Sequence, residues 1–178
     1  MSEHDIPDGE ALHRSEPSPF ASDVGGGALI SRTAPADPLY REYYIVTGGR
    51  DFRDGKALYG ALDALLAFSR PEWFVLVHGR CKTGADAIAD TWARSREVDC
   101  ESYPAQWTRQ GKRAGPLRNQ RMLATILARR MPTMVIHCPG GDGTADMMWR
   151  VEAAIKCGHD IKVSPVYDPH AKFMRDGA

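Results

Sequence analysis

The chain has 178 residues, 43% of them hydrophobic and 26% charged, and its 23 basic residues balance 23 acidic ones. This length supports one domain of common size with its own core. The neutral balance excludes a global field for nucleic acid or anionic membrane, so a nucleic-acid partner would need a local basic patch. No apolar run approaches the roughly 20 residues that span a bilayer. The polar start Met1–Asp5 is unlike a secretory signal, which predicts a cytoplasmic protein without a membrane partner.

The cysteines are scattered singly along the chain, at Cys81, Cys100, Cys138 and Cys157. None forms a C-x-x-C pair and none has a histidine at zinc-finger spacing, which favours reduced, mostly buried thiols over a metal site or a disulfide. A Cys-His nucleophile pair stays open, because His78, His137 and Cys138 fall at predicted strand ends. The sequence predicts neither a metal nor a cofactor.

Residues 1–41 are expected to form a disordered or extended tail. They contain five prolines, the run Gly25–Gly27 and no sustained apolar period, so they bury too little surface to offset the entropy of ordering. The domain is expected over residues 42–168, followed by a frayed tail at 169–178.

Within the domain, short β-rich or apolar runs alternate with helical patterns. Strands are predicted at Tyr43–Thr47, Trp73–His78, Cys100–Pro104, Thr133–Cys138 and Ile161–Ser164. The segments between them carry apolar residues at the i, i+3, i+4 spacing of a buried helix face. This alternation predicts an α/β fold, a Rossmann-like three-layer α/β/α sandwich with a mostly parallel five-stranded sheet. In such sheets, ligands bind at the carboxyl ends of the strands.

The segment after the first strand, Thr47–Phe52, contains Gly48, Gly49 and Arg50. The two glycines allow the backbone to approach a ligand closely, and Arg50 can pair with a phosphate. The alternative is a tight strand-to-helix turn with a solvated arginine.

The segment after the second strand, His78–Asp86, leads into a helix. Gly79, Thr83 and Gly84 precede the helix N-terminus, whose free amides and partial positive charge suit an anion. Asp86 either binds a ribose hydroxyl or caps amides, or is simply a helix-favouring acid.

The third segment, Gln106–Asn119, is polar and basic. Trp107 either stacks on a base or packs over the loop as a lid. Lys112 adds a cation, and Arg118 and Asn119 are expected to project from the first turn of a helix toward the strand ends.

The fourth segment is the loop P-G-G-x-G-T between a strand and a helix, which we interpret as a phosphate cradle. It matches neither the P-loop nor the dinucleotide-binding fingerprint. Its candidate ligand-binding residues are Gly140, Gly141, Asp142, Gly143 and Thr144.

Taken in order, these segments resemble the SLOG superfamily, specifically its small YpsA-related members of bacteria and phages. The resemblance covers residues 43 to about 165 and implies a Rossmann-like fold whose strand-end loops bind nucleotides or nucleotide-derived molecules, with a homodimer expected. The matching motifs are Thr47–Phe52, His78-Gly79 with Thr83–Asp86, Tyr103–Ala105 with Trp107, Gly111-Lys112, Gly115-Pro116 with Arg118-Asn119 and Met122, and the P-G-G-x-G-T loop.

The related LOG phosphoribohydrolases cleave the N-glycosidic bond of nucleoside monophosphates, usually as dimers. Their loop reads P-G-G-x-G-T-x-x-E, and its glutamate is catalytic together with an upstream arginine, which Arg118 matches by its place before Met122. Met147 stands at the glutamate position and cannot activate a water. Asp146 points about 100° away around the helix, so it replaces the glutamate only if the first turn is distorted.

The favoured function is binding or sensing of a phosphate-bearing nucleotide or nucleotide-derived ligand. The alternative is an N-glycosidic nucleotide hydrolase, with Arg118 beside Asp86, Asp146 or Asp142. DNA binding through a local patch of arginines and lysines is less favoured, because the chain is neutral; the patch would hold Arg109, Lys112, Arg113, Arg118 and Arg121. A homodimer is consistent with large apolar residues beyond one core face, at Met122, Met147, Met148 and Trp149. The same residues fit a core role equally well, because methionine fills irregular gaps.

Overall fold

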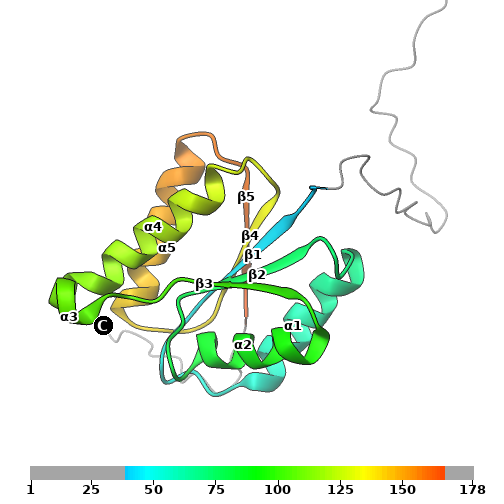
Figure 1. The fold of residues 1–178 in the computed structure, drawn as a ribbon, viewed down its shortest axis with the longest axis horizontal. Helices are drawn as coiled ribbons and strands as arrows, with labels where there is room; N and C mark the ends of the chain where they lie inside the picture. Colours follow the sequence, from blue (N-terminus) through cyan, green and yellow to red (C-terminus); the bar gives the residue numbers. More distant parts are fainter. Residues whose placement is uncertain (1–38, 167–178) are drawn as a thin grey trace, which may run out of the picture. The chain divides into compact units, whose positions relative to one another are not determined.

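The computed structural model describes residues 39–166. The C-terminal tail expected at 169–178, and all but the last three residues of the N-terminal tail expected at 1–41, lie outside these residues. Within the described part, the chain folds as alternating strands and helices (Figure 1).

Five strands form one parallel sheet in the order β3-β2-β1-β4-β5. They are β1 (Glu42–Thr47), β2 (Phe74–His78), β3 (Asp99–Ser102), β4 (Thr133–His137) and β5 (Ile161–Pro165). In the register, Ile45 of β1 pairs with Val77 on one side and Val135 on the other. The predicted parallel sheet is confirmed. Because the chain moves outward from β1 to β3 and then returns to the far side of β1, the strand order reverses between β1 and β4.

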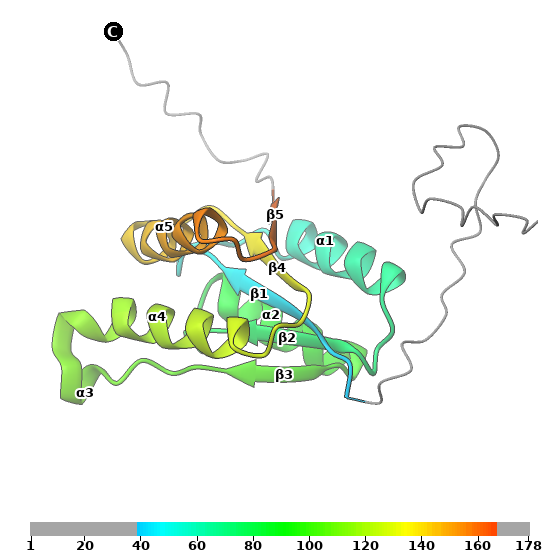
Figure 2. The same ribbon diagram turned by 90° about the horizontal axis from the view of Figure 1, so that it is seen from above.

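Two helices cover each face of the sheet (Figures 1 and 2). On one face lie α1 (Gly55–Phe68) and α2 (Ala85–Arg96), and on the other α4 (Ala114–Leu127) and α5 (Asp142–Lys156). Alternate strand residues enter the two cores: Tyr44 and Val46 pack with α1 and α2, whereas Ile45 packs with α4 and α5. The three-layer sandwich is therefore confirmed. No helix within residues 39–166 is long and apolar enough to cross a membrane.

Two short helical segments precede α4 that the sequence pattern does not predict. They are α3 (Trp107–Gln110) and the 3-10 helix η1 (Gly111–Arg113). Every residue of both is exposed, so no apolar face exists to produce a helical period. Gly111, at φ +51°, separates the two turns.

The large apolar residues considered for a dimer surface are mostly core. Met122 and Met147 are buried between the sheet and helices α4 and α5, and Met148 packs against the same core. Of the four, only Trp149 is mostly exposed, at 65% of the residue. The homodimer stays a prediction.

Candidate functional site

A cavity of about 430 Å³ opens where the strand order reverses. Its wall is built from the segments that follow β1, β2, β3 and β4, which is where an open parallel sheet binds ligands. The predicted site residues that line it are Gly48, Gly49, Arg50, Gly79, Asp86, Trp107, Lys112, Arg118, Asn119, Gly141, Asp142, Gly143 and Thr144. Four predicted residues are not among its lining: Thr83, Gly84, Gly140 and Asp146.

The glycine loops after β1 and β4 pack directly against each other. The amide of Gly49 donates to the carbonyl of Pro139 at 2.9 Å. A Cβ on residue 140 would lie 2.2 Å from Thr144 Oγ1 and 2.5 Å from Gly49 N. Gly140 therefore holds the two loops together, and only a glycine fits there.

The N-terminus of α5 is not capped by a side chain. The amides of Thr144 and Ala145 donate to the carbonyl of Gly141 at 2.9 and 3.0 Å. The amides of Asp142 and Gly143 come before the first such bonds, so they have no acceptor inside the helix. Both residues line the cavity. Together with the helix dipole, these amides suit an anion.

Arg118 reaches from α4 toward Asp86 on the opposite helical layer. Its Nη1 lies 3.6 Å from Asp86 Oδ2, and the two side chains are 13% and 6% exposed. The same carboxylate oxygen accepts a hydrogen bond from the amide of Cys81 at 3.0 Å. A Cβ on residue 79 would lie 0.8 Å from Arg118 Nη1, so a glycine is needed at position 79 for this crossing.

The Arg118 guanidinium lines the cavity and, among the described residues, has one unpaired donor. Its Nε is buried and has no hydrogen-bond partner within residues 39–166, and Asp86 is its ion-pair partner there. A guanidinium carries five N–H donors in a fork that fits a phosphate. Nearby, burial raises the pKa of the Cys81 thiol and Asp86 raises it further, so Cys81 is a neutral part of the wall.

Asn119 and Asp146 connect α4 to the phosphate loop. Asn119 is 3% exposed, and its Nδ2 donates to the carbonyl of Gly143 at 3.0 Å and to Asp146 Oδ2 at 2.9 Å. Arg150 donates to both oxygens of Asp146 at 3.0 Å. The Asp146 carboxylate is thus occupied on both oxygens.

Met147, at the position of the LOG glutamate, is fully buried in the core beside α4 and the sheet. The side chain three residues after Thr144 therefore points into the apolar core and not into the cavity. Among the described residues, the carboxylates that line the cavity are Asp51, Asp86 and Asp142, and Asp86 alone of these three is buried.

The structure does not bring Thr83 to the cavity. Thr83 is exposed and lines a separate groove between α1 and α2, together with Gly84. Gly84 has a φ of +74°, and a Cβ there would lie 2.1 Å from the carbonyl oxygen of Gly49. Gly84 therefore fits α2 against the loop after β1, a contact that the sequence does not reveal.

Trp107 lies at the edge of the cavity, with 49% of the residue exposed. The Arg50 Cζ lies 5.3 Å from its ring centroid, so two segments from different strands meet there. A Cβ on Gly115 would come within 3.5 Å of the indole. Sequence reasoning did not single out several other lining residues, namely Asp51, Cys81, Gly115, Pro116 and Met122. Of these, Asp51, Gly115, Pro116 and Met122 lie within the matching family motifs, whereas Cys81 gave no such signal.

Donor atoms of His78, Asp90 and Cys100 lie within 4.8 Å of one another on the α2 side of the sheet. His78 Nδ1 accepts a hydrogen bond from the amide of Arg80 at 3.1 Å. The proton of the neutral ring therefore sits on Nε2, which faces Asp90 at 3.4 Å and has no lone pair for a cation. Burial and Asp90 raise the pKa of the Cys100 thiol to about 11, which also disfavours a thiolate ligand.

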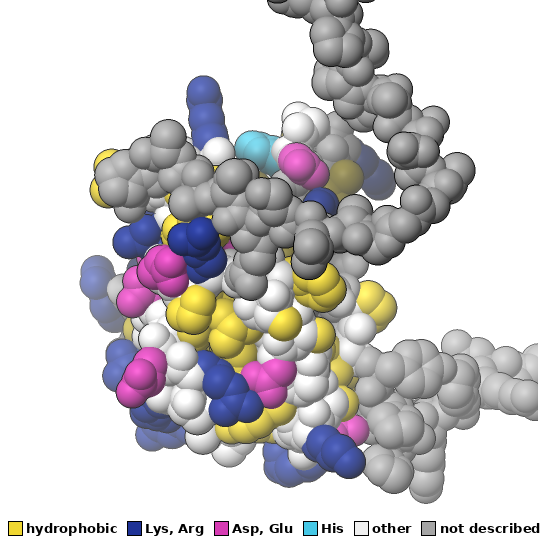
Figure 3. All heavy atoms as spheres, turned by 90° about the vertical axis from the view of Figure 1, so that its right-hand side faces the viewer, with side chains coloured by type: hydrophobic (Ala, Val, Ile, Leu, Met, Phe, Trp, Pro, Cys, Tyr) yellow, Lys and Arg dark blue, Asp and Glu magenta, His cyan; other side chains and the backbone are white. Residues whose placement is uncertain are grey.

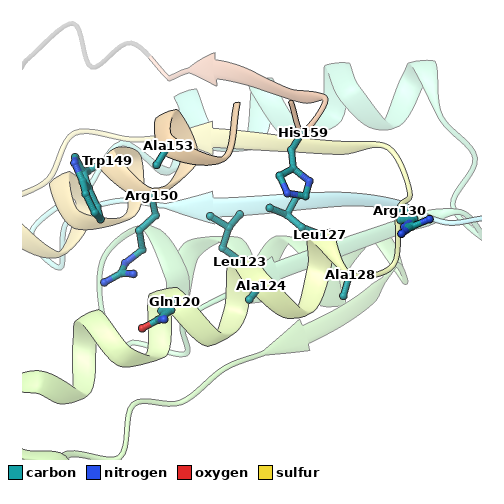
Figure 4. A pocket seen from close by; sticks show the side chains of 10 residues that line it. All are labelled: Gln120, Leu123, Ala124, Leu127, Ala128, Arg130, Trp149, Arg150, Ala153 and His159. Atoms are coloured by element: carbon teal, nitrogen blue, oxygen red, sulfur yellow. The ribbon is translucent and has the colours of Figure 1, made fainter. Parts of the chain in front are cut away.

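A wider groove lies between α4 and α5 (Figure 4). Leu123, Leu127 and Ala153 give it an apolar floor, and Trp149 stands at one end. Arg150 is already bound to Asp146. None of the predicted site residues lines this groove, so the cavity at the β1–β4 reversal is the candidate site.

Comparison with known proteins bears on the family of the chain. Residues 44–110 match the model of the YspA, cpYpsA-related SLOG family. The chain is also similar to the Gene 61 protein of Mycobacterium phage D29, at 39% identity over 84 residues, which is 44% of this chain and 66% of that protein. The resemblance to the SLOG family is confirmed over residues 44–110. This match suggests a role in binding or processing a nucleotide-related ligand. Arg118 and the phosphate loop lie beyond the matched range.

Proposed function

We propose that the cavity binds the phosphate group of a nucleotide or nucleotide-derived ligand, in a sensing or processing role. One observation carries this proposal: the uncapped N-terminus of α5 and the Arg118 guanidinium line the same cavity. Backbone amides at a helix N-terminus and a forked guanidinium are complementary ways to hold a phosphate.

The dimensions and rim of the cavity support a nucleotide. A volume of about 430 Å³ falls in the range of small-molecule sites. Trp107 offers an aromatic face at the edge, on which a base can stack. Lys112 lines the same wall and adds a second cation.

A second candidate is hydrolysis of an N-glycosidic bond, and the burial of Asp86 in the cavity wall favours it. One oxygen of this carboxylate already receives the Cys81 amide and faces Arg118. Asp146 is held by Asn119 and Arg150. These contacts give both acids positioning roles, so binding is the better-supported function.

The experiment is a panel of nucleoside monophosphates, NAD and ADP-ribose, followed by melting temperature and by chromatography of released base. A ligand that binds only the folded state raises stability by RT ln(1 + [L]/Kd). The matched variants are Arg118→Gln and Arg130→Gln; Arg130 is exposed and does not line the cavity. A melting shift that Arg118→Gln loses and Arg130→Gln keeps supports binding. Base release lost in the same variant supports hydrolysis, and no shift with any nucleotide rejects both.

A further inference from the structure

The basic residues of this neutral chain are unevenly distributed. The segment from Tyr103 to Arg121 contains five basic residues and no acidic one. By contrast, basic and acidic side chains are interspersed on the face that looks away from α3 (Figure 3). Three of the five form what we call the basic rim: Arg109, Lys112 and Arg113, on α3 and η1.

Within the described part of the chain, the charges of the basic rim have no compensating partner. Arg109, Lys112 and Arg113 are all exposed, and none forms an ion pair or a side-chain hydrogen bond with another residue between 39 and 166. Other arginines form ion pairs with carboxylates: Arg129 lies 2.6 Å from Glu101, and Arg150 lies 3.0 Å from Asp146. An uncompensated cluster of positive charges raises the local concentration of anions.

The basic rim reaches the cavity through Lys112. Lys112 lines the cavity wall, and so does Trp107 of the same short segment. Deeper in the cavity, the free amides of the α5 N-terminus and the Arg118 guanidinium are available for one phosphate, at what we call the inner position. Arg109 and Arg113 lie outside the cavity lining. A single phosphate at the inner position therefore does not neutralise their charges.

We infer that the ligand carries more than one phosphate group, one held at the N-terminus of α5 and another against the basic rim. This inference rests on the proposed function, because the phosphate bound at the N-terminus of α5 holds the ligand in the cavity. The second phosphate belongs either to a 5′-polyphosphate chain or to a second position on the sugar. The shared chemistry is a nucleotide with several phosphates.

The test measures affinity by calorimetry in EDTA at low salt. The ligands are the 5′-monophosphates, 5′-triphosphates and 3′,5′-bisphosphates of adenosine and guanosine. Arg109→Gln/Arg113→Gln removes two charges from the basic rim. Lys156→Gln/Lys162→Gln removes two exposed charges that lie outside the cavity lining and serves as the matched control.

The wild type is expected to bind a ligand with additional phosphate about tenfold more tightly than the monophosphate, as two exposed ion pairs allow. The rim variant should lose this gain and the control should keep it. In roughly 0.5 M salt the gain should vanish, because exposed charges are screened. A gain confined to the triphosphates places the second phosphate on the chain, and one confined to the bisphosphates places it on the sugar.

Equal affinity for monophosphate and multiply phosphorylated ligands overturns this inference and leaves the proposed function standing. A gain that the rim variant retains also overturns it. A single-stranded oligonucleotide is titrated beside these ligands. If it binds more tightly than every small nucleotide, the small ligand is rejected in favour of nucleic acid. If no nucleotide binds, the proposed function fails first and the inference with it.

Discussion

Arg118 on α4 and Asp86 on α2 meet across the carboxyl edge of the sheet, with 3.6 Å between Nη1 and Oδ2. The two helices cover opposite faces, so this ion pair joins the two layers directly above the end of β2. The crossing is possible because residue 79 has no Cβ. The position of the proposed phosphate ligand therefore depends on a glycine that carries no chemistry of its own.

Gly79→Ala is expected to reduce nucleotide binding with little loss of stability. The new Cβ would overlap Arg118 Nη1 at 0.8 Å, and the end of a flexible side chain can move away. We expect at least a roughly tenfold weaker Kd, which corresponds to about 1.4 kcal/mol, with the melting temperature within a few degrees of wild type. Calorimetry and thermal unfolding of the same preparation measure both quantities.

The matched control is Gly60→Ala, in the exposed interior of α1, where a Cβ meets nothing within 4 Å. It should raise stability by about 0.5–1 kcal/mol, because alanine favours a helix over glycine. It should leave the Kd unchanged. Wild-type affinity in Gly79→Ala would show that Arg118 does not bind the ligand from this position.

Gly140→Ala and Gly141→Ala should differ in stability although they are neighbours. A Cβ at 140 meets the backbone of Gly49 at 2.5 Å, whereas one at 141 meets nothing within 4 Å. Since backbone cannot move aside as a side chain can, we expect Gly140→Ala to lose about 2 kcal/mol or more. Chemical denaturation measures both variants, and equal midpoints would contradict the described packing of the two loops.

Met147→Glu should unfold the domain rather than create a LOG-type hydrolase. Residue 147 is fully buried in the apolar core, and an unpaired carboxylate there costs several kcal/mol, about 3 or more. Met147→Leu conserves volume and should cost less than about 1.5 kcal/mol. Circular dichroism and base-release assays on both variants test this. A folded, active Met147→Glu protein would show that the first turn of α5 places residue 147 in the cavity.

His78 should make the domain less stable in mild acid. Burial lowers its pKa from the ordinary 6.5, against the opposing charges of Asp86 and Asp90. The unfolded chain therefore takes up a proton below about pH 6.5 that the folded chain resists, so stability is full above that pH and falls as the pH drops. The slope contributed by one proton is at most about 1.4 kcal/mol per pH unit.

His78→Asn separates this titration from packing. The asparagine oxygen can accept the Arg80 amide hydrogen bond that Nδ1 accepts now. The variant should lose stability at every pH because it is smaller, but its dependence between pH 7 and 5 should be shallower than that of the wild type. Urea midpoints across this range measure the slope. His137, whose pKa burial also lowers, retains its own contribution in both proteins.

The central strands β1, β2 and β4 could be predicted because they are apolar runs bounded by glycine or proline. The glycine loops follow strand ends, where ligands bind in this fold class. The helical nature of α3 and η1 could not be predicted, because exposed residues leave no apolar period. The roles of Gly79 and Asn119 also escaped prediction. Each depends on a partner far along the chain, Arg118 for the first and the Gly143 carbonyl for the second. Sequence spacing carries no information on such contacts.

Amide chemical-shift mapping during a nucleotide titration tests the central claim most directly, and the chain of 19.6 kDa suits it. A bound phosphate should shift the amide resonances of Asp142 and Gly143 most, and Gly79 should follow as Arg118 turns toward the ligand. Saturable binding that leaves these resonances unchanged, or that shifts only the groove between α4 and α5 (Figure 4), would contradict the claim.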